Sequence, residues 1–204
     1  MAELKLTPSD DTRAYNNEAT TNYGSSETTV VRYYTGGPTY DLAYFKWDLS
    51  TAPPASSINT AKFYFYVTIP SADIDDVNTY QINADWAEDT LTYNNKPGVT
   101  GDNLATFDVT STGWKNGDIT SIVKDWINGD KNNYGIRLWN VRSRNQYATI
   151  ATKENTTESY RPYLLIDYTL AGGILNWWFF KEAWEKHDKL WTPTIPKLSE
   201  GYSI

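Results

Sequence analysis

Cysteine is absent from the 204-residue sequence, and histidine occurs once, at His187. Without cysteine the chain has no disulfide, no thiolate nucleophile and no zinc–sulfur site. Because His187 lies close to the C-terminus, the main body of the chain cannot contain a catalytic centre that uses histidine as its base. These two absences exclude the hydrolases that pair serine or cysteine with histidine from most of the chain.

Positive charge is not in excess, because 18 Lys and Arg against 25 Asp and Glu give a formal net charge of −7. This balance argues against a nucleic-acid partner, whose phosphates require clustered Lys and Arg. No stretch approaches the ~20 apolar residues that span a bilayer. Residues 1–12 also lack the hydrophobic segment of a signal peptide.

The absence of cysteine, together with many Thr, Asn and Tyr residues, nevertheless favours an extracellular or virion-surface protein. Two explanations account for the missing signal peptide. Either it has been removed, or the protein reaches the outside without secretion, as virion proteins do at lysis. Composition does not choose between them.

Aromatic residues are abundant, at 15% of the chain with 16 Tyr and 9 Trp. In residues 61–67 the alternation turns Phe63 and Phe65 to one side and Tyr64 and Tyr66 to the other. Short strands separated by Gly and Pro turns predict an all-β fold, an antiparallel two-sheet β-sandwich of jelly-roll type. The predicted strands are 28–34, 40–49, 61–67, 77–82, 134–139, 146–152 and 162–169.

One short helix is predicted near residues 119–128, capped by Asp118 and ended by Gly129. Its apolar residues recur at helical spacing; they are Ile119, Ile122, Val123, Trp126 and Ile127. We expect six large aromatic side chains to form the core of the sandwich: Phe45, Trp47, Phe63, Phe65, Trp86 and Trp126.

The character of the chain changes at residues 171–173, which divides it into a body, 1–170, and a tail, 171–204. The spacing predicts a helix over residues 174–191, followed by an extended arm. Its aromatic stripe, Trp177, Phe180, Trp184 and Trp191, indicates docking to a protein partner in a larger assembly. Packing on the chain's own sandwich and lying on a membrane surface are the alternatives.

Eight short motifs follow one another between residues 10 and 169. They are Asp11-Thr12, Asn22-Tyr23-Gly24, residues 43–50, Ile58 with Ala61, residues 86–94 with Pro97, Asp118-Ile119-Thr120 with Val123 and Trp126, Asn133-Tyr134-Gly135, and residues 161–164. In this order the body resembles the DNRLRE-type domain, a β-sandwich module of cell-surface and secreted proteins that is related to a family of carbohydrate-binding modules. The resemblance implies a fold and a surface location, and no shared active site.

Two features depart from that family: Tyr93 stands where the family usually has Trp, and the 34-residue tail has no counterpart.

Asp85, Glu88 and Asp89 surround Trp86 and fit the paired carboxylates of a glycosidase. Because they coincide with a motif of the resembled family, we instead expect them to hold a turn that places Trp86 in the core. The chain is therefore not expected to be an enzyme.

Asp73, Asp75 and Asp76 form an acidic cluster that is compatible with Ca²⁺. The cluster lacks the glycine and the distal glutamate of an EF-hand loop, so a solvated loop without a cofactor is the preferred interpretation.

Six tyrosines are candidates for contact with a glycan, because exposed rings stack on pyranose sugars. Tyr64 and Tyr66 form an aromatic ladder on the side opposite the predicted core, and a plain sheet surface is an equal alternative. The other four candidates are Tyr33, Tyr34, Tyr40 and Tyr44.

Two functions follow from these observations. The first is a non-catalytic structural or adhesive module of a larger outer assembly, a virion or cell-surface fibre, anchored by its tail with the sandwich facing outward. The alternative is a carbohydrate-binding module, free or appended to a polysaccharide-degrading enzyme. Neither involves a nucleic acid or a membrane span.

Overall fold

The computed structural model describes residues 1–34, 36–37, 39–140 and 146–170. The predicted tail helix, with Trp177, Phe180, Trp184 and Trp191, lies outside the described residues. Residues Met1–Thr169 form one compact unit. Among the described residues, no helix has the length and apolar character needed to cross a membrane.

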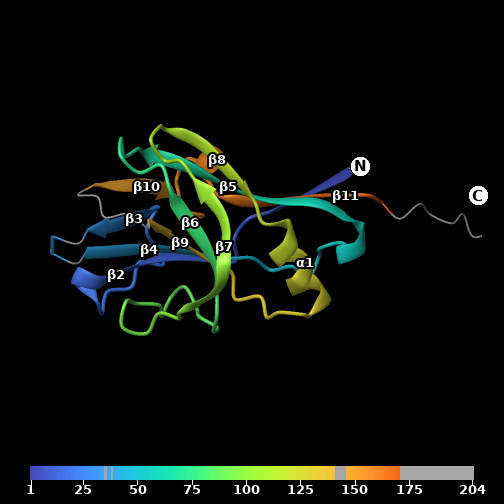
Figure 1. The fold of residues 1–204 in the computed structure, drawn as a ribbon, viewed down its shortest axis with the longest axis horizontal. Coiled ribbons are helices and arrows are strands. Elements are labelled where there is room, and N and C mark those ends of the chain that lie inside the picture. The colour runs from blue at the N-terminus through green and yellow to red at the C-terminus, as the bar shows by residue number, and fades with distance from the viewer. Residues whose placement is uncertain (35, 38, 141–145, 171–204) are drawn as a thin grey trace, which may run out of the picture. The chain divides into compact units, whose positions relative to one another are not determined.

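The described residues form a strongly curved antiparallel β-sheet (Figure 1). Its strands follow the order β1-β11-β5-β10-β3-β4-β9-β6-β7, while β2 pairs with β4 and β8 pairs with β5. The strands are β1 (Ala2–Leu6), β2 (Asp10–Tyr15), β3 (Thr28–Tyr34), β4 (Thr39–Lys46), β5 (Ile58–Ile69), β6 (Val77–Ile82), β7 (Val99–Phe107), β8 (Gly113–Asp118), β9 (Ile136–Asn140), β10 (Tyr147–Ala151) and β11 (Tyr163–Tyr168).

The sheet curls so that β5 and β11 face β4, β9 and β6 across the larger core cluster. Phe63 of β5 lies 4.9 Å from Phe45 of β4 between ring centroids, although these strands are not neighbours in the sheet. Phe63 also meets Phe107 of β7, edge to face. The all-β sandwich architecture predicted from the sequence is therefore confirmed, with its two layers joined into one hydrogen-bonded sheet.

Strand β4 is buried on both sides, since a second core cluster covers the side that faces away from the first. This second cluster contains Ala14, Leu42, Tyr44, Ile82, Trp86 and Leu91. Trp86 and Leu91 belong to residues 83–98, the connection between β6 and β7, which we call the covering segment. The prediction that Tyr44 contacts a glycan is wrong, because its side chain is fully buried under this segment.

The predicted short helix is present as α1 (Thr120–Asn128), and it buries Ile122, Val123 and Trp126. Gly129 ends it in the left-handed conformation, with φ of 79°. At its start, Asp118 Oδ1 accepts a hydrogen bond from the Thr120 N–H at 2.8 Å. The described part of the chain also contains three short 3-10 helices: η1 (Asn16–Glu18), η2 (Ala55–Ser57) and η3 (Glu158–Tyr160).

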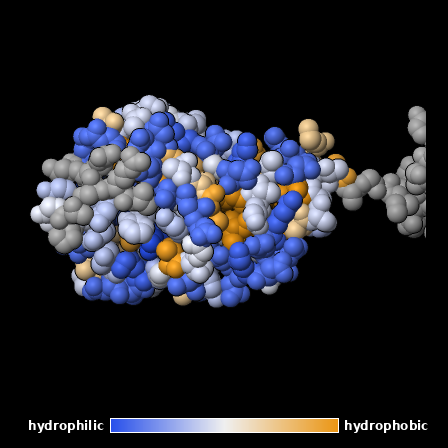
Figure 2. Space-filling view, viewed as in Figure 1, coloured by the Kyte–Doolittle hydropathy of each residue, from blue (hydrophilic) through white to orange (hydrophobic). Residues whose placement is uncertain are grey.

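Hydrophilic residues cover most of the surface seen in Figure 2, with small hydrophobic patches between them. All six aromatic side chains expected in the core are buried, namely Phe45, Trp47, Phe63, Phe65, Trp86 and Trp126. Packing of the core therefore accounts for the positions of these six rings. It does not account for large aromatic side chains that lie outside the two core clusters.

Candidate functional site

Aromatic side chains gather on the outer face of β5, the side turned away from the larger core cluster. Phe63 and Phe65 point into that cluster, so the alternation of the strand turns Tyr64 and Tyr66 outward. β11 and β8 pair with opposite edges of β5, and their registers place Tyr163 beside Tyr64 and Trp114 beside Tyr66. With Tyr160 of η3, these residues form what we call the β5 face: Tyr64, Tyr66, Trp114, Tyr160 and Tyr163.

The rings of the β5 face are organised as two stacked pairs joined by a tryptophan. Tyr64 and Tyr163 stack with centroids 4.8 Å apart, and Tyr66 and Tyr160 stack at 3.9 Å. Trp114 meets Tyr66 at 5.6 Å and Tyr163 at 5.1 Å, edge to face in both cases. Edge-to-face and stacked pairs each add about 0.5–1.5 kcal/mol beyond their buried area, so the group holds a defined arrangement.

The β5 face remains open to solvent. Trp114 is 40% exposed, and none of the five rings is among the described residues that make up the two core clusters. Polar groups flank the rings: Lys5 Nζ lies 3.9 Å from the Tyr163 centroid, and Asn116 lies opposite Tyr64 in the register of β5 and β8. The arrangement combines apolar ring surface with adjacent hydrogen-bonding groups.

A second aromatic group lies on the outer side of β3, β4, β9 and β6, and we call it the β4 face: Tyr33, Tyr40, Tyr80 and Trp139. Tyr33 stacks on Tyr40 at 5.2 Å, and Trp139 lies 6.2 Å from both Tyr33 and Tyr80. The Arg137 guanidinium lies 5.4 Å from the Trp139 ring. Trp139 packs against the second core cluster, so part of this group serves the packing of the covering segment.

Tyr34, another of the predicted glycan contacts, stands apart from both faces. It lies at a shallow hollow of about 240 Å³ near the end of the β3–β4 hairpin. This hollow is lined by Arg32, Tyr34, Thr39, Gln146 and Tyr147. The structure thus distributes the six candidate tyrosines over the two faces, this hollow and the buried position of Tyr44.

Three aromatic residues of the β5 face were not among the sequence candidates: Trp114, Tyr160 and Tyr163. Tyr163 carries a usable signal, because it lies in a predicted strand on the side opposite the buried Leu164 and Ile166. Trp114 lies in β8, a strand that the sequence pattern does not reveal, and Tyr160 belongs to a short 3-10 helix.

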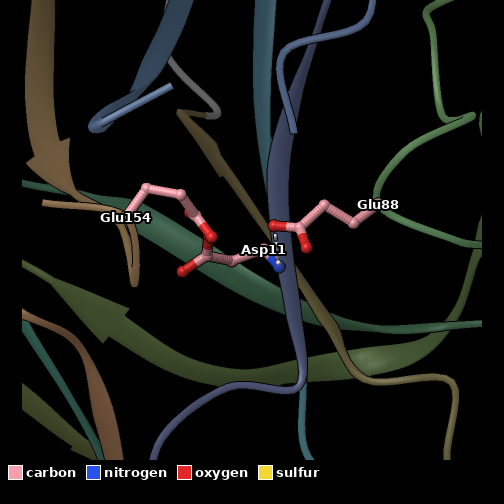
Figure 3. Close-up of side chains that lie close together, drawn as sticks. All are labelled: Asp11, Glu88 and Glu154. Atoms are coloured by element: carbon pink, nitrogen blue, oxygen red, sulfur yellow. Dashed lines mark hydrogen bonds between the residues drawn. The ribbon is translucent and has the colours of Figure 1, made fainter. Parts of the chain in front are cut away.

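Glu88, one of the suspected glycosidase carboxylates, points toward Asp11 (Figure 3). Its Oε1 accepts a hydrogen bond from the Asp11 N–H at 3.3 Å, and its Oε2 lies 2.6 Å from Lys153 Nζ. Carboxylate oxygens of Glu88, Asp11 and Glu154 come within 4.8 Å of one another. Burial raises the pKa of Glu88, and the hydrogen bond from Lys153 opposes that rise.

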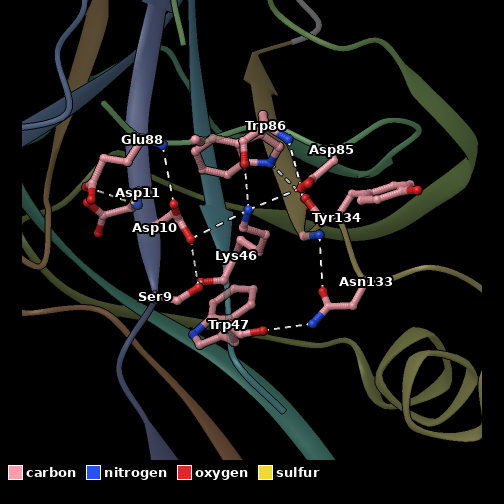
Figure 4. Close-up of polar contacts among 12 residues, drawn as sticks. Ser9, Asp10, Asp11, Lys46, Trp47, Asp85, Trp86, Glu88, Asn133 and Tyr134 are labelled. Carbon is pink, nitrogen blue, oxygen red and sulfur yellow. Dashed lines mark hydrogen bonds and ion pairs between the residues drawn. The ribbon is translucent and has the colours of Figure 1, made fainter. Parts of the chain in front are cut away.

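Asp85 takes part in a network that fastens the covering segment (Figure 4). Its Oδ1 accepts a hydrogen bond from the Trp86 N–H at 2.9 Å and lies 3.3 Å from Lys46 Nζ. Lys46 also donates to the Trp86 carbonyl at 2.6 Å, while the Trp86 indole N–H donates to the Tyr134 carbonyl at 2.8 Å. Asp89 is exposed. The structure thus engages Asp85 and Glu88 in bonds that hold the fold.

Asp73, Asp75 and Asp76 lie between β5 and β6, and Asp73 Oδ2 accepts a hydrogen bond from Gln146 Nε2 at 2.8 Å. The preference for a solvated loop over a calcium site at these three residues stays a prediction.

Comparison with known proteins identifies the family. No curated protein matches the chain. The profile of carbohydrate-binding module family 96 matches residues 2–168, which include every strand described above and both aromatic faces. The match supports the carbohydrate-binding part of the resemblance seen in the motifs, while the DNRLRE-type label itself is not confirmed. The chain therefore belongs to carbohydrate-binding module family 96.

Proposed function

We propose that the chain is a non-catalytic module that binds a polysaccharide through the β5 face. The observation that carries the proposal is Trp114, which is exposed, contacts both stacked tyrosine pairs and belongs to neither core cluster. An aromatic ring in this position offers apolar area to the face of a sugar ring. Membership of a carbohydrate-binding family supports a carbohydrate as the ligand.

The shape of the β5 face favours a chain of sugars over a single sugar. Its rings extend across β11, β5 and β8, and two strand spacings amount to roughly 10 Å. Enclosed pockets suit small molecules, whereas an open strip of rings suits an extended ligand. Lys5, Lys62 and Asn116 lie beside the rings and provide hydrogen-bonding groups for hydroxyls at its margins.

The β4 face is the second candidate, favoured by the stacked Tyr33 and Tyr40 and by the nearby guanidinium of Arg137. It ranks second because Trp139 packs against the second core cluster, which already explains its position.

The experiment compares one ring from each face. Affinity electrophoresis against a panel of neutral and acidic polysaccharides first identifies a ligand for the unmodified chain. Trp114→Ala should then weaken retention by about 30-fold, since removal of a central aromatic anchor costs about 2 kcal/mol. Tyr80→Ala, from the β4 face, should bind as the unmodified chain does.

Loss of binding in Tyr80→Ala with full binding in Trp114→Ala would move the site to the β4 face. Failure of the unmodified chain to bind any polysaccharide of the panel would count against the proposed function as a whole. Far-UV circular dichroism of each variant controls for folding.

The role in a larger outer assembly remains a second hypothesis, and it depends on residues 171–204. In that view the module acts at a cell or virion surface, with the tail as its anchor. A chain ending at residue 170 would then keep its polysaccharide binding and lose its incorporation into the parent assembly. Loss of folding on truncation would instead favour packing of the tail on its own sandwich.

A further inference from the structure

Three carboxylates from distant parts of the sequence meet beside the covering segment. Asp11 comes from β2, Glu88 from the covering segment and Glu154 from the connection between β10 and β11. Figure 3 shows the carboxylates of Asp11 and Glu154 directed at each other, with Glu88 reaching in from the opposite side. The cluster lies outside both aromatic faces, so it is independent of the proposed sugar site.

The hydrogen bonds of this cluster are incomplete. Asp11 is fully buried, and its Oδ2 accepts a hydrogen bond from the Lys153 N–H at 2.8 Å. Its other oxygen, Oδ1, is buried without a hydrogen-bond partner, and so is Oε2 of Glu154. A buried acceptor without a partner costs about 1–3 kcal/mol, and a charged one costs more. Two buried oxygens of one carboxylate cluster therefore have no hydrogen-bond donor among the described residues.

The charges of the cluster are also incompletely balanced. Among the described residues, the ion pairs to Glu88 and Glu154 come from Lys153, whose ammonium contacts both carboxylates. A single ammonium leaves one formal positive charge against three carboxylates.

We propose that Asp11, Glu88 and Glu154 bind a divalent cation, for which calcium is the best match. Carboxylate oxygens are the ligands that Ca²⁺ prefers, and its six to eight ligands tolerate irregular geometry. Asp11 Oδ1 and Glu154 Oε2 provide two buried oxygens that have no hydrogen-bond donor among the described residues. A hollow of about 330 Å³, which Glu88 and Glu154 help to line, gives water access to complete the coordination.

Lys153 takes a defined part in this proposal. Its side chain is 19% exposed, so the ammonium can turn toward solvent when an ion enters. The ion then neutralises Glu88 and Glu154 in place of the ammonium. Lys153 therefore competes with the cation for the same oxygens.

The test measures thermal unfolding and isothermal titration calorimetry of the full chain with CaCl₂. The titration runs from about 10⁻⁵ to 10⁻² M, which brackets the dissociation constants of about 10⁻⁴–10⁻³ M of extracellular calcium modules. NaCl holds the ionic strength constant, and EDTA gives the ion-free reference. The melting temperature should rise with calcium concentration, because an ion that binds only the folded state stabilises it by mass action.

Three variants sharpen the result. Glu154→Gln removes one charged ligand and should weaken calcium binding at least tenfold. Glu158→Gln makes the same change at an exposed carboxylate four residues further along the chain and should leave the affinity unchanged. Lys153→Gln removes the competing ammonium and should bind calcium more tightly than the unmodified chain.

The proposal is overturned if 10 mM Ca²⁺ produces neither a heat nor a rise in melting temperature, or if Glu154→Gln responds as the unmodified chain does. Weaker binding by Lys153→Gln would contradict the assigned geometry. If Glu154→Gln does not fold, the titration of the unmodified chain still decides the outcome. Polysaccharide binding is measured separately, so a negative calcium result does not contradict sugar binding at the β5 face.

Discussion

Strands β4 and β5 have the same alternation of side chains, yet their outer faces differ. On β4 the outward Tyr44 is fully buried, because the covering segment places Trp86 against it at 5.7 Å between centroids. On β5 the outward Tyr64 and Tyr66 stay partly exposed and join Trp114. Alternation determines on which side of a strand an aromatic ring lies. Whether that ring is exposed depends on whether a segment distant in the sequence, such as the covering segment, packs over it.

The largest expected effect is the difference in lost stability between alanine variants of the outward tyrosines on the two strands. Tyr44→Ala should lower the free energy of unfolding by about 3–5 kcal/mol, as removal of a fully buried aromatic ring does. Tyr66→Ala, at a partly exposed position outside both core clusters, removes two ring pairs and should cost less, about 1–3 kcal/mol. Urea unfolding of both variants measures the difference, and equal losses would remove the distinction between the faces.

A second prediction concerns the pH dependence of stability that arises from Asp41, which is buried near the start of β4. Burial raises the pKa of Asp41 to about 6, although Arg13 and Arg32 lie 3.6 and 3.5 Å away. Because the pKa is higher in the folded state than in the unfolded state, the folded chain retains this proton longer. Ionisation of Asp41 therefore reduces stability as the pH rises from about 4 to about 6, by a contribution on the order of 3 kcal/mol.

The measurement is the free energy of unfolding of the unmodified chain minus that of Asp41→Asn, at several pH values. This difference should fall from pH 4 to pH 6 and then level off. A difference that rises with pH over this range would show that the two arginines outweigh the burial of Asp41.

A smaller effect is expected at the network that fastens the covering segment. Lys46→Met removes the hydrogen bond to the Trp86 carbonyl and should cost about 1.5 kcal/mol, the lower end for hydrogen bonds to charged groups. Lys62→Met, on the outer side of β5, provides the matched control and should change stability by less than about 0.5 kcal/mol. A greater loss at Lys62 than at Lys46 would contradict the assigned role of the network.

The sequence is sufficient to predict strands that are rich in β-branched and aromatic residues, or whose side chains alternate between apolar and polar. β3, β4, β5, β6, β9, β10 and β11 were all predicted, with boundaries that differ by a few residues. β8 was missed, because its sequence contains two glycines and no alternation of apolar and polar side chains. Its strand conformation depends on its pairing with β5. β1, β2 and β7 were not predicted either.

The candidate sites depend still more on tertiary structure. Trp114 and Tyr163 meet Tyr66 and Tyr64 only through the registers of three strands. Asp11 and Glu154 are brought together by the sheet from opposite ends of the body. Residue types indicate the chemistry of such sites, and the pairing of strands determines which residues combine.

The most direct test of the central claim follows tryptophan indole resonances while a ligand is added. An oligosaccharide of the polysaccharide found in the panel is titrated into ¹⁵N-labelled protein, with indole signals assigned through Trp114→Phe and Trp139→Phe. If the β5 face binds the sugar, the Trp114 indole N–H resonance shifts in a saturable manner while that of Trp139 stays in place. A saturable shift of Trp139 with an unchanged Trp114 would contradict carbohydrate binding at the β5 face.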